Sequence, residues 1–139
     1  MNGAVVLDSW ILLAWLKGQR PGAEAMDVLW RAAAAGGVRL FLNLINLGEV
    51  YYLTAKAASL AQAGRILQQL RAMPLEIWPV SEELVLEAAR LKARFPISYA
   101  DAFAAATARS VPAPLATGDP EFRKLERQGL LELRWAGNG

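Results

Sequence analysis

The chain has 139 residues, of which 55% are hydrophobic and 20% are charged, a balance typical of one packed globular domain and not of a disordered protein. Its net charge of +2 permits an anionic partner without requiring one. Cysteine and histidine are both absent, which excludes disulfides, thiolate nucleophiles, zinc sites built on cysteine and any Ser-His-Asp arrangement. Any bound metal is therefore expected to be an ion that prefers oxygen ligands, Mg²⁺ or Mn²⁺.

The first half of the chain alternates short β-branched runs with apolar helical segments. The run AVVLD (4–8) is typical of a buried strand, and the pair Gly36-Gly37 is a signal that ends a helix. The elements expected in this half are a strand at 4–8, helices at 9–17 and 23–35, a strand at 38–43, helices from about 46 to 58 and from about 60 to 72, and a strand at 75–80.

The second half continues the alternation. Ser81 can cap a helix over 82–95, in which acidic residues lead and basic residues trail, as the helix dipole favours. Further elements are expected as a helix at 97–108, a strand at 113–117, a helix at 120–129 and a strand at 131–135. Strands that alternate with helices predict an α/β fold with a parallel sheet covered on both faces. Because no repeat or linker divides the sequence, we expect a single domain over residues 1–139.

The sequence predicts neither a membrane span nor a targeting segment. The apolar run WILLAWL (10–16) is far shorter than the ~20 residues that cross a bilayer. No basic region precedes it, as a signal peptide would require. We therefore expect a cytoplasmic protein with no membrane association.

Four acids lie near predicted helix starts, and helix capping is sufficient to explain each one alone: Asp8, Glu49, Asp101 and Asp119. Asp8 ends the first strand and can cap the helix at 9–17. Asp119 precedes Pro120, and proline is favoured at the first position of a helix. Glu49 and Asp101 each follow a polar residue, Asn46 and Ser98, by three positions, which is the spacing of a capping box.

Taken together, the same acids suggest a shared site. In an open parallel sheet the carboxyl ends of the strands and the starts of the following helices line one edge, where ligands bind. Asp8 and Asp119 directly follow apolar strands, and Glu49 and Asp101 lie in first helical turns that can face the same crevice. Carboxylates held close together repel one another, and a divalent cation relieves that repulsion. Capping and metal binding are compatible, because a carboxylate has two oxygens.

Four segments resemble, in order, the four motifs of PIN-domain ribonucleases, and most nearly those of the VapC-type toxins of toxin–antitoxin pairs: VVLDSWILLAWL, NLINLGEVYYL, ISYADAFAAATA and APLATGDPEFRKL. The resemblance covers nearly the whole chain. It implies a three-layer fold with a central parallel five-stranded sheet flanked by helices. Asn43 and Asn46 depart from the pattern, since relatives often carry Ser or Thr at these positions.

The resemblance also implies a site and an activity. Asp8, Glu49, Asp101 and Asp119 would hold one or two Mg²⁺ or Mn²⁺ ions, with Ser9 and Thr117 as supporting hydroxyls. These four acids would be the catalytic residues of a metal-dependent endoribonuclease that hydrolyses RNA phosphodiesters through metal-activated water. Glu49 would either ligate the metal or orient water.

Partner binding is suggested by apolar helices and implied by the resemblance. The segment 9–17 is apolar nearly all round, which is typical of a helix buried in a core or covered by another chain. Two adjacent tyrosines in GEVYYL (48–53) cannot share one helix face. The resemblance implies a homodimer, an RNA substrate and a VapB-type antitoxin with a segment across the cleft.

Two other functions stay open: a PIN nuclease that acts in RNA maturation or decay outside a toxin system, and a catalytically silent α/β interaction module whose acids are only helix caps. Two further classes are disfavoured. A phosphatase of the haloacid dehalogenase type needs a second aspartate two residues after its nucleophile, and Asp8 is followed by Ser9 and Trp10. A response-regulator receiver needs an early acidic pair and a late lysine after a strand, and neither is evident.

Overall fold

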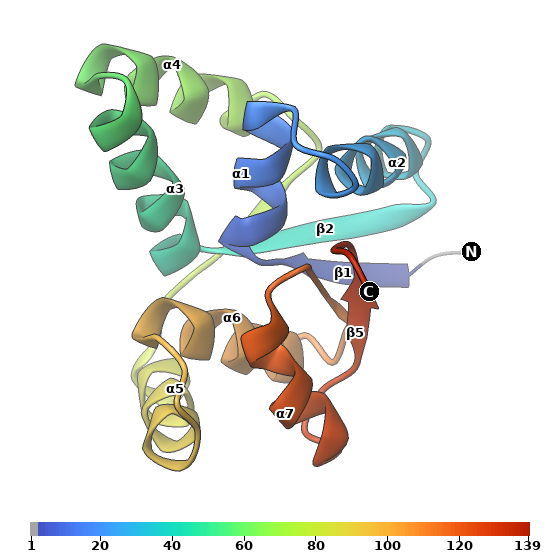
Figure 1. The fold of residues 1–139 in the computed structure, drawn as a ribbon, viewed down its shortest axis with the longest axis vertical. Helices are drawn as coiled ribbons and strands as arrows, with labels where there is room; N and C mark the ends of the chain where they lie inside the picture. Colours follow the sequence, from blue (N-terminus) through green and yellow to red (C-terminus); the bar gives the residue numbers. More distant parts are fainter. Residues whose placement is uncertain (1–2) are drawn as a thin grey trace.

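The computed structural model describes residues 3–139, so residues 1 and 2 of the predicted domain lie outside the described residues. Within 3–139, five strands form one parallel sheet in the order β3-β2-β1-β4-β5 (Figure 1). The elements in chain order are β1 (Gly3–Leu7), α1 (Ser9–Lys17), α2 (Gly22–Ala34), β2 (Val38–Asn43), α3 (Leu44–Ala57), α4 (Leu60–Arg71), β3 (Glu76–Trp78), α5 (Glu82–Arg94), α6 (Tyr99–Ser110), β4 (Leu115–Thr117), the 3₁₀ helix η1 (Pro120–Phe122), α7 (Arg123–Arg127) and β5 (Leu133–Trp135). The predicted α/β fold with a central parallel five-stranded sheet is confirmed.

The sheet is buried on both faces, which gives the predicted three layers. Successive side chains of β1 point to opposite faces, as in any strand. Val5 and Leu7 belong to one apolar cluster with α1, α2, α3 and α4, whereas Val6 belongs to a second cluster with α5, α6 and α7. Figure 1 shows these two groups of helices on opposite sides of the sheet. Near-continuous apolar strands of this kind are expected where both faces are covered.

Alanine allows α6 to pack closely against the sheet and α5. Every residue of this helix from Asp101 to Ala108 is buried. Ser98 begins the helix, because its Oγ accepts a hydrogen bond from the backbone N–H of Asp101 at 3.1 Å. The first turn of α6, which carries Asp101, is therefore held firmly against the core.

The start of α3 differs from the prediction. The helix begins at Leu44, directly after β2, and its cap is Asn43, whose side chain accepts a hydrogen bond from the N–H of Ile45 at 2.8 Å. The capping box predicted for Asn46 and Glu49 is therefore wrong. Asn46 is instead buried inside the helix and donates to the carbonyl of Ala100 at 3.0 Å, which links α3 to α6.

The last third of the chain is less regular than predicted. The helix expected at 120–129 is divided into η1 and α7, and β4 and β5 each have three residues. Among residues 3–139, no helix has the length and apolarity to cross a membrane.

The strand order has a switch point between β1 and β4. The chain leaves β1 toward β2 on one side, and β4 lies on the other side of β1. Open α/β sheets bind ligands at such a switch point, outside the carboxyl ends of the strands. Asp8 follows β1 and Asp119 lies two residues after β4, so the fold places both acids at this edge.

Candidate metal centre

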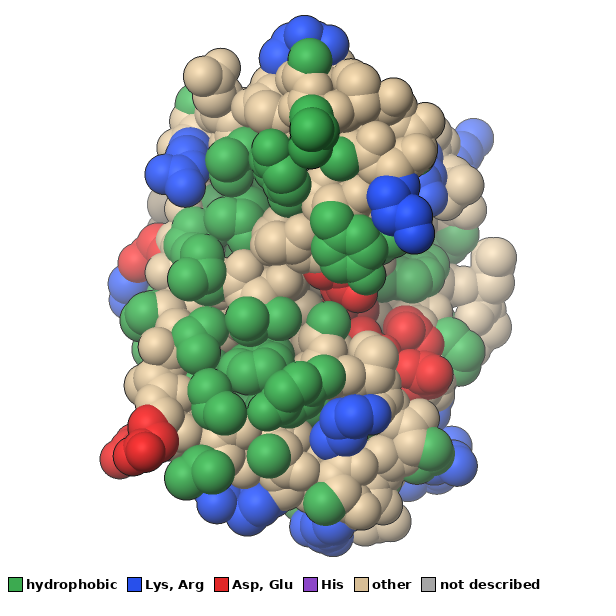
Figure 2. All heavy atoms as spheres, turned by 90° about the vertical axis from the view of Figure 1, so that its left-hand side faces the viewer, with side chains coloured by type: hydrophobic (Ala, Val, Ile, Leu, Met, Phe, Trp, Pro, Cys, Tyr) green, Lys and Arg blue, Asp and Glu red, His purple; other side chains and the backbone are tan. Residues whose placement is uncertain are grey.

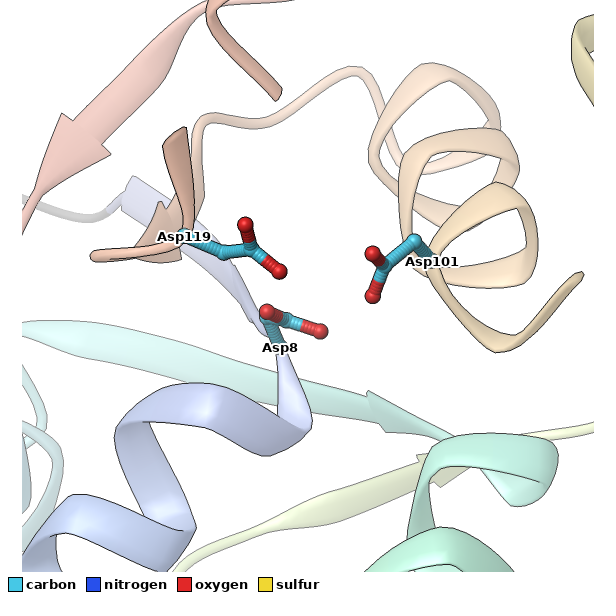
Figure 3. Close-up of side chains that lie close together, drawn as sticks. All are labelled: Asp8, Asp101 and Asp119. Atoms are coloured by element: carbon cyan, nitrogen blue, oxygen red, sulfur yellow. The ribbon is translucent and has the colours of Figure 1, made fainter. Parts of the chain in front are cut away.

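Three aspartates from three separate parts of the chain converge at this edge of the sheet. Asp8 lies between β1 and α1, Asp101 lies in the first turn of α6, and Asp119 precedes η1. One carboxylate oxygen from each lies within 4.8 Å of those from the other two. Figure 3 shows the three carboxylates pointing toward one another. The sequence predicts a shared site of four acids, and the three aspartates among them form this cluster.

Asp8 is the most deeply buried acid of the cluster, with 1% of its surface exposed. It occupies the position before α1, but its carboxylate makes no capping hydrogen bond, so the predicted cap is wrong. Oδ2 accepts a hydrogen bond from the hydroxyl of Thr117 at 2.9 Å. Oδ1 is buried and has no hydrogen-bond partner among residues 3–139. Buried polar atoms are nearly always partnered, so this oxygen is available for a ligand.

Thr117 joins two of the acids. Its hydroxyl donates to Asp8 and accepts a hydrogen bond from the backbone N–H of Asp119 at 3.0 Å. The side chain is fully buried. Thr117 therefore fixes the orientation of the Asp8 carboxylate and the position of the Asp119 backbone at the same time.

Replacement of Thr117 by valine is expected to lower the free energy of unfolding by about 1–3 kcal/mol at pH 8, because valine keeps the shape but leaves a buried carboxylate without its donor. Urea denaturation of the metal-free protein measures this loss. The matched variant Thr117→Ser keeps the hydroxyl and should retain most of the stability. Equal losses for valine and serine would show that the hydroxyl contributes nothing.

Asp119 is a true helix cap. Its Oδ1 accepts a hydrogen bond from the N–H of Glu121 at 3.0 Å, and Pro120 occupies the first position of η1. This confirms the predicted cap. Asp119 therefore both caps η1 and contributes a carboxylate oxygen to the cluster.

Asp101 carries the largest perturbation of the site. The pKa of Asp101 is raised to about 9, chiefly by burial and then by the negative charge of Asp8 and by contact with Glu121. Only 7% of its surface is exposed. Glu121 was not anticipated from the sequence as a neighbour of the cluster. The signal that could have identified it is its position two residues after Asp119, in the first turn that follows the strand edge.

Glu49 lies outside the three-aspartate cluster but close to it. Its Oε1 accepts a hydrogen bond from the hydroxyl of Ser9, the residue that follows Asp8. Burial is the main cause that raises the pKa of Asp8 to about 7; the Thr117 hydrogen bond lowers that pKa, and the charges of Glu49 and Asp119 raise it. Ser9 therefore connects Glu49 to the site in place of a direct contact.

The cluster gathers carboxyl groups, and no basic side chain among residues 3–139 forms an ion pair with them. No salt bridge formed within residues 3–139 involves Asp8, Asp101 or Asp119. Converging carboxylates, with one buried oxygen that has no hydrogen-bond partner among residues 3–139, are the donor set that a hard divalent cation prefers. The residues present therefore fit Mg²⁺ or Mn²⁺.

The fold and the acidic edge define an α/β domain of the PIN type. The PIN domain profile matches residues 5–128, and the chain belongs to the PIN domain family. No curated protein matches it in sequence.

Solved structures share the fold at low sequence identity. VapBC2 from Rickettsia felis, bound to a DNA fragment from its promoter, superposes with a TM-score of 0.71 at 20% identity, covering 94% of this chain and 97% of that chain. VapBC-1 from nontypeable Haemophilus influenzae gives 0.69 at 21% identity, covering 95% and 97%. VapC20 from Mycobacterium tuberculosis, described as a toxin that cleaves the sarcin-ricin loop, gives 0.70 at 15% identity, covering 86% and 93%.

Proposed function

We propose that this chain is a metal-dependent endoribonuclease with a single PIN-like nuclease domain. The observation that carries the proposal is the convergence of Asp8, Asp101 and Asp119, together with a buried Asp8 oxygen that has no hydrogen-bond partner among residues 3–139. Helix capping does not explain this arrangement, because only Asp119 caps a helix through its carboxylate. A silent interaction module would have no reason to bring three acids together, two of them buried.

We assign the metal-binding role to the three aspartates and a supporting role to their neighbours. Asp8, Asp101 and Asp119 would hold one or two Mg²⁺ or Mn²⁺ ions. A divalent cation in such a site lowers the pKa of bound water and stabilises negative charge on a phosphodiester. Thr117 keeps the Asp8 carboxylate in one orientation. Glu49, which accepts a hydrogen bond from Ser9, would orient water or complete the ligand set.

Cleavage of a defined single-stranded RNA by the purified protein tests the activity. We expect cleavage with Mg²⁺ or Mn²⁺, loss of cleavage with a chelator, and recovery when excess metal is restored. Addition of the metal-free buffer serves as the control. RNA that stays intact at every metal concentration would contradict the proposed activity and would favour the silent module.

Within this activity, we propose the role of a VapC-type toxin. The support is that the neighbours in fold include VapBC complexes and a VapC toxin. A VapB-type antitoxin would then be the natural partner. Growth arrest on induction of the wild-type chain, relieved by the product of an adjacent reading frame, tests this role. Growth that is unaffected would favour an RNA maturation or decay nuclease.

We also propose that two copies of this chain form a homodimer. Figure 2 shows acidic side chains in a hollow, bordered by apolar side chains over much of the same face. Large apolar side chains are exposed on neighbouring helices: Leu44, Ile45 and Tyr52 on α3, Leu86 on α5 and Tyr99 on α6. Apolar surface of this extent is typical of a protein interface.

A further inference from the structure

The indole of Trp10 lies against two glycines from distant parts of the chain, Gly22 and Gly118. A Cβ atom built on Gly118 would lie 2.3 to 2.6 Å from three carbons of the six-membered ring. A Cβ atom on Gly22, at the start of α2, would lie 2.8 Å from Cζ3 of the same ring. Real Cβ atoms do not approach neighbouring atoms this closely. Any residue larger than glycine at either position would therefore overlap the indole. The indole of Trp10 is therefore packed closely against both glycines.

Position 118 requires glycine because neighbouring atoms pack closely against it, and not because of its backbone conformation. Its backbone is outside the left-handed region, which alanine would avoid. The only obstacle to a side chain at this position is therefore the space filled by neighbouring atoms. The three nearest of those atoms are all carbons of the Trp10 ring.

Residues 136 and 137 also lie against this turn. A Cβ atom on Gly137 would lie 2.9 Å from both Cα and the carbonyl oxygen of Gly118. The N–H of Ala136 donates to the carbonyl of Thr117 at 2.9 Å. The turn Thr117–Gly118–Asp119 is thus confined between Trp10 and the segment 136–137.

This confined turn carries two of the contacts that build the acidic cluster. Thr117 donates to Asp8, and the N–H of Asp119 donates back to Thr117. A displacement of the turn would move the Asp119 carboxylate and weaken the hydrogen bond to Asp8. Ligand sets tolerate errors of only about 0.5 Å.

We propose that Trp10 is a positioning residue for the metal centre: its indole presses on Gly118 and so sets the position of Asp119 relative to Asp8. This inference rests on the proposed function, because it assumes that the aspartates bind a divalent cation. The role differs from ordinary core packing, since its effect is transmitted through one turn to one ligand.

Mn²⁺ affinity, measured by titration calorimetry at pH 8, tests the inference, with circular dichroism to confirm folding. Gly118→Ala is expected to weaken Mn²⁺ binding at least ~10-fold, the loss typical when a group that orients a ligand is disturbed. Gly64→Ala is the matched control, because a Cβ there meets nothing within 4 Å, and its Mn²⁺ affinity should equal that of the wild type.

Variants of Trp10 separate positioning from general packing. Trp10→Leu, with Gly118 intact, should weaken Mn²⁺ binding in a protein that still folds, because the turn loses its support. The double variant Trp10→Leu/Gly118→Ala should bind Mn²⁺ more tightly than Gly118→Ala alone, because the shorter side chain vacates the space that the methyl group needs. A role in packing alone would lower the melting temperature of these variants without changing their Mn²⁺ affinity.

The outcomes distinguish this inference from the function on which it rests. Wild-type protein that binds no Mn²⁺ would overturn the proposed metal-dependent function, and the inference with it. Wild-type protein that binds Mn²⁺, with folded Trp10→Leu of unchanged affinity, would overturn the role of Trp10 alone. If Gly118→Ala fails to fold, Trp10→Leu and the rescue by the double variant still decide the question, since a double variant that also fails to fold or bind contradicts the inference.

Discussion

Asp101→Asn is expected to stabilise the metal-free protein and to abolish the stabilisation that Mg²⁺ or Mn²⁺ gives to the wild type. Burial and the charge of Asp8 disfavour the ionised Asp101 carboxylate, and asparagine removes that cost. We expect a gain on the order of 2 kcal/mol in the free energy of unfolding at pH 8, because one unit of pKa shift corresponds to about 1.4 kcal/mol and part of the shift is shared with neighbouring acids. Urea denaturation with and without metal measures both effects.

Asp27→Asn is the matched control for this substitution. Asp27 is exposed on α2 and accepts a hydrogen bond from Nε1 of Trp15 at 3.0 Å, outside the acidic cluster. Its replacement should leave the stabilisation by metal unchanged. An Asp101→Asn protein that metal stabilises as strongly as the wild type would show that Asp101 does not contribute to a metal site.

The metal-free protein is expected to become less stable as the pH rises from 5 to 9. The pKa values of Asp8 and Asp101 in the folded protein are about 7 and about 9, both above the value of 3.8 that applies to an unperturbed aspartate. Between pH 4 and pH 9 the folded state therefore binds more protons than the unfolded state, so the free energy of unfolding falls as the pH increases. We expect a loss of at least ~2 kcal/mol across the window from pH 5 to pH 9.

Urea denaturation in the presence of a chelator measures this loss, and the same titration in saturating Mn²⁺ is its counterpart. Metal binds the ionised carboxylates, so it should reduce or remove the fall in stability at high pH. Asp101→Asn should also flatten the pH dependence. Metal-free stability that is constant or rises from pH 5 to pH 9 would contradict the burial of these acids as a cluster.

Much of the fold was predictable because strand and helix periods differ clearly in this sequence. The helix at 9–17 and the strand at 38–43 have the predicted bounds. The start of α3 was missed because Asn43 and Asn46 are equally good caps by type, and only the direct passage from β2 into the helix makes Asn43 the cap. The order of the strands was not predicted, because local sequence patterns do not determine which strands pair with which.

The site was predictable to the extent that it depends on strand ends. Asp8 and Asp119 follow apolar strands, so a parallel sheet places them at one edge. The partner of Glu49 was not predictable, because spacing along a helix does not indicate that the hydroxyl of Ser9 will bind its carboxylate. Contact of Glu121 with Asp101 and of Trp10 with Gly118 depends on tertiary packing alone.

The most direct test of the central claim is the rate of Mn²⁺-dependent RNA cleavage by four single variants, in which each aspartate of the chain is replaced by asparagine. Folding of each variant is confirmed by circular dichroism. Variants at Asp8, Asp101 and Asp119 are expected to lose at least ~10²-fold in rate, because each removes a charge from the proposed site, whereas Asp27→Asn should cleave as the wild type does. Cleavage that survives in the three cluster variants, or that is lost equally at Asp27, would contradict the assignment of the acidic cluster as a metal-dependent nuclease site.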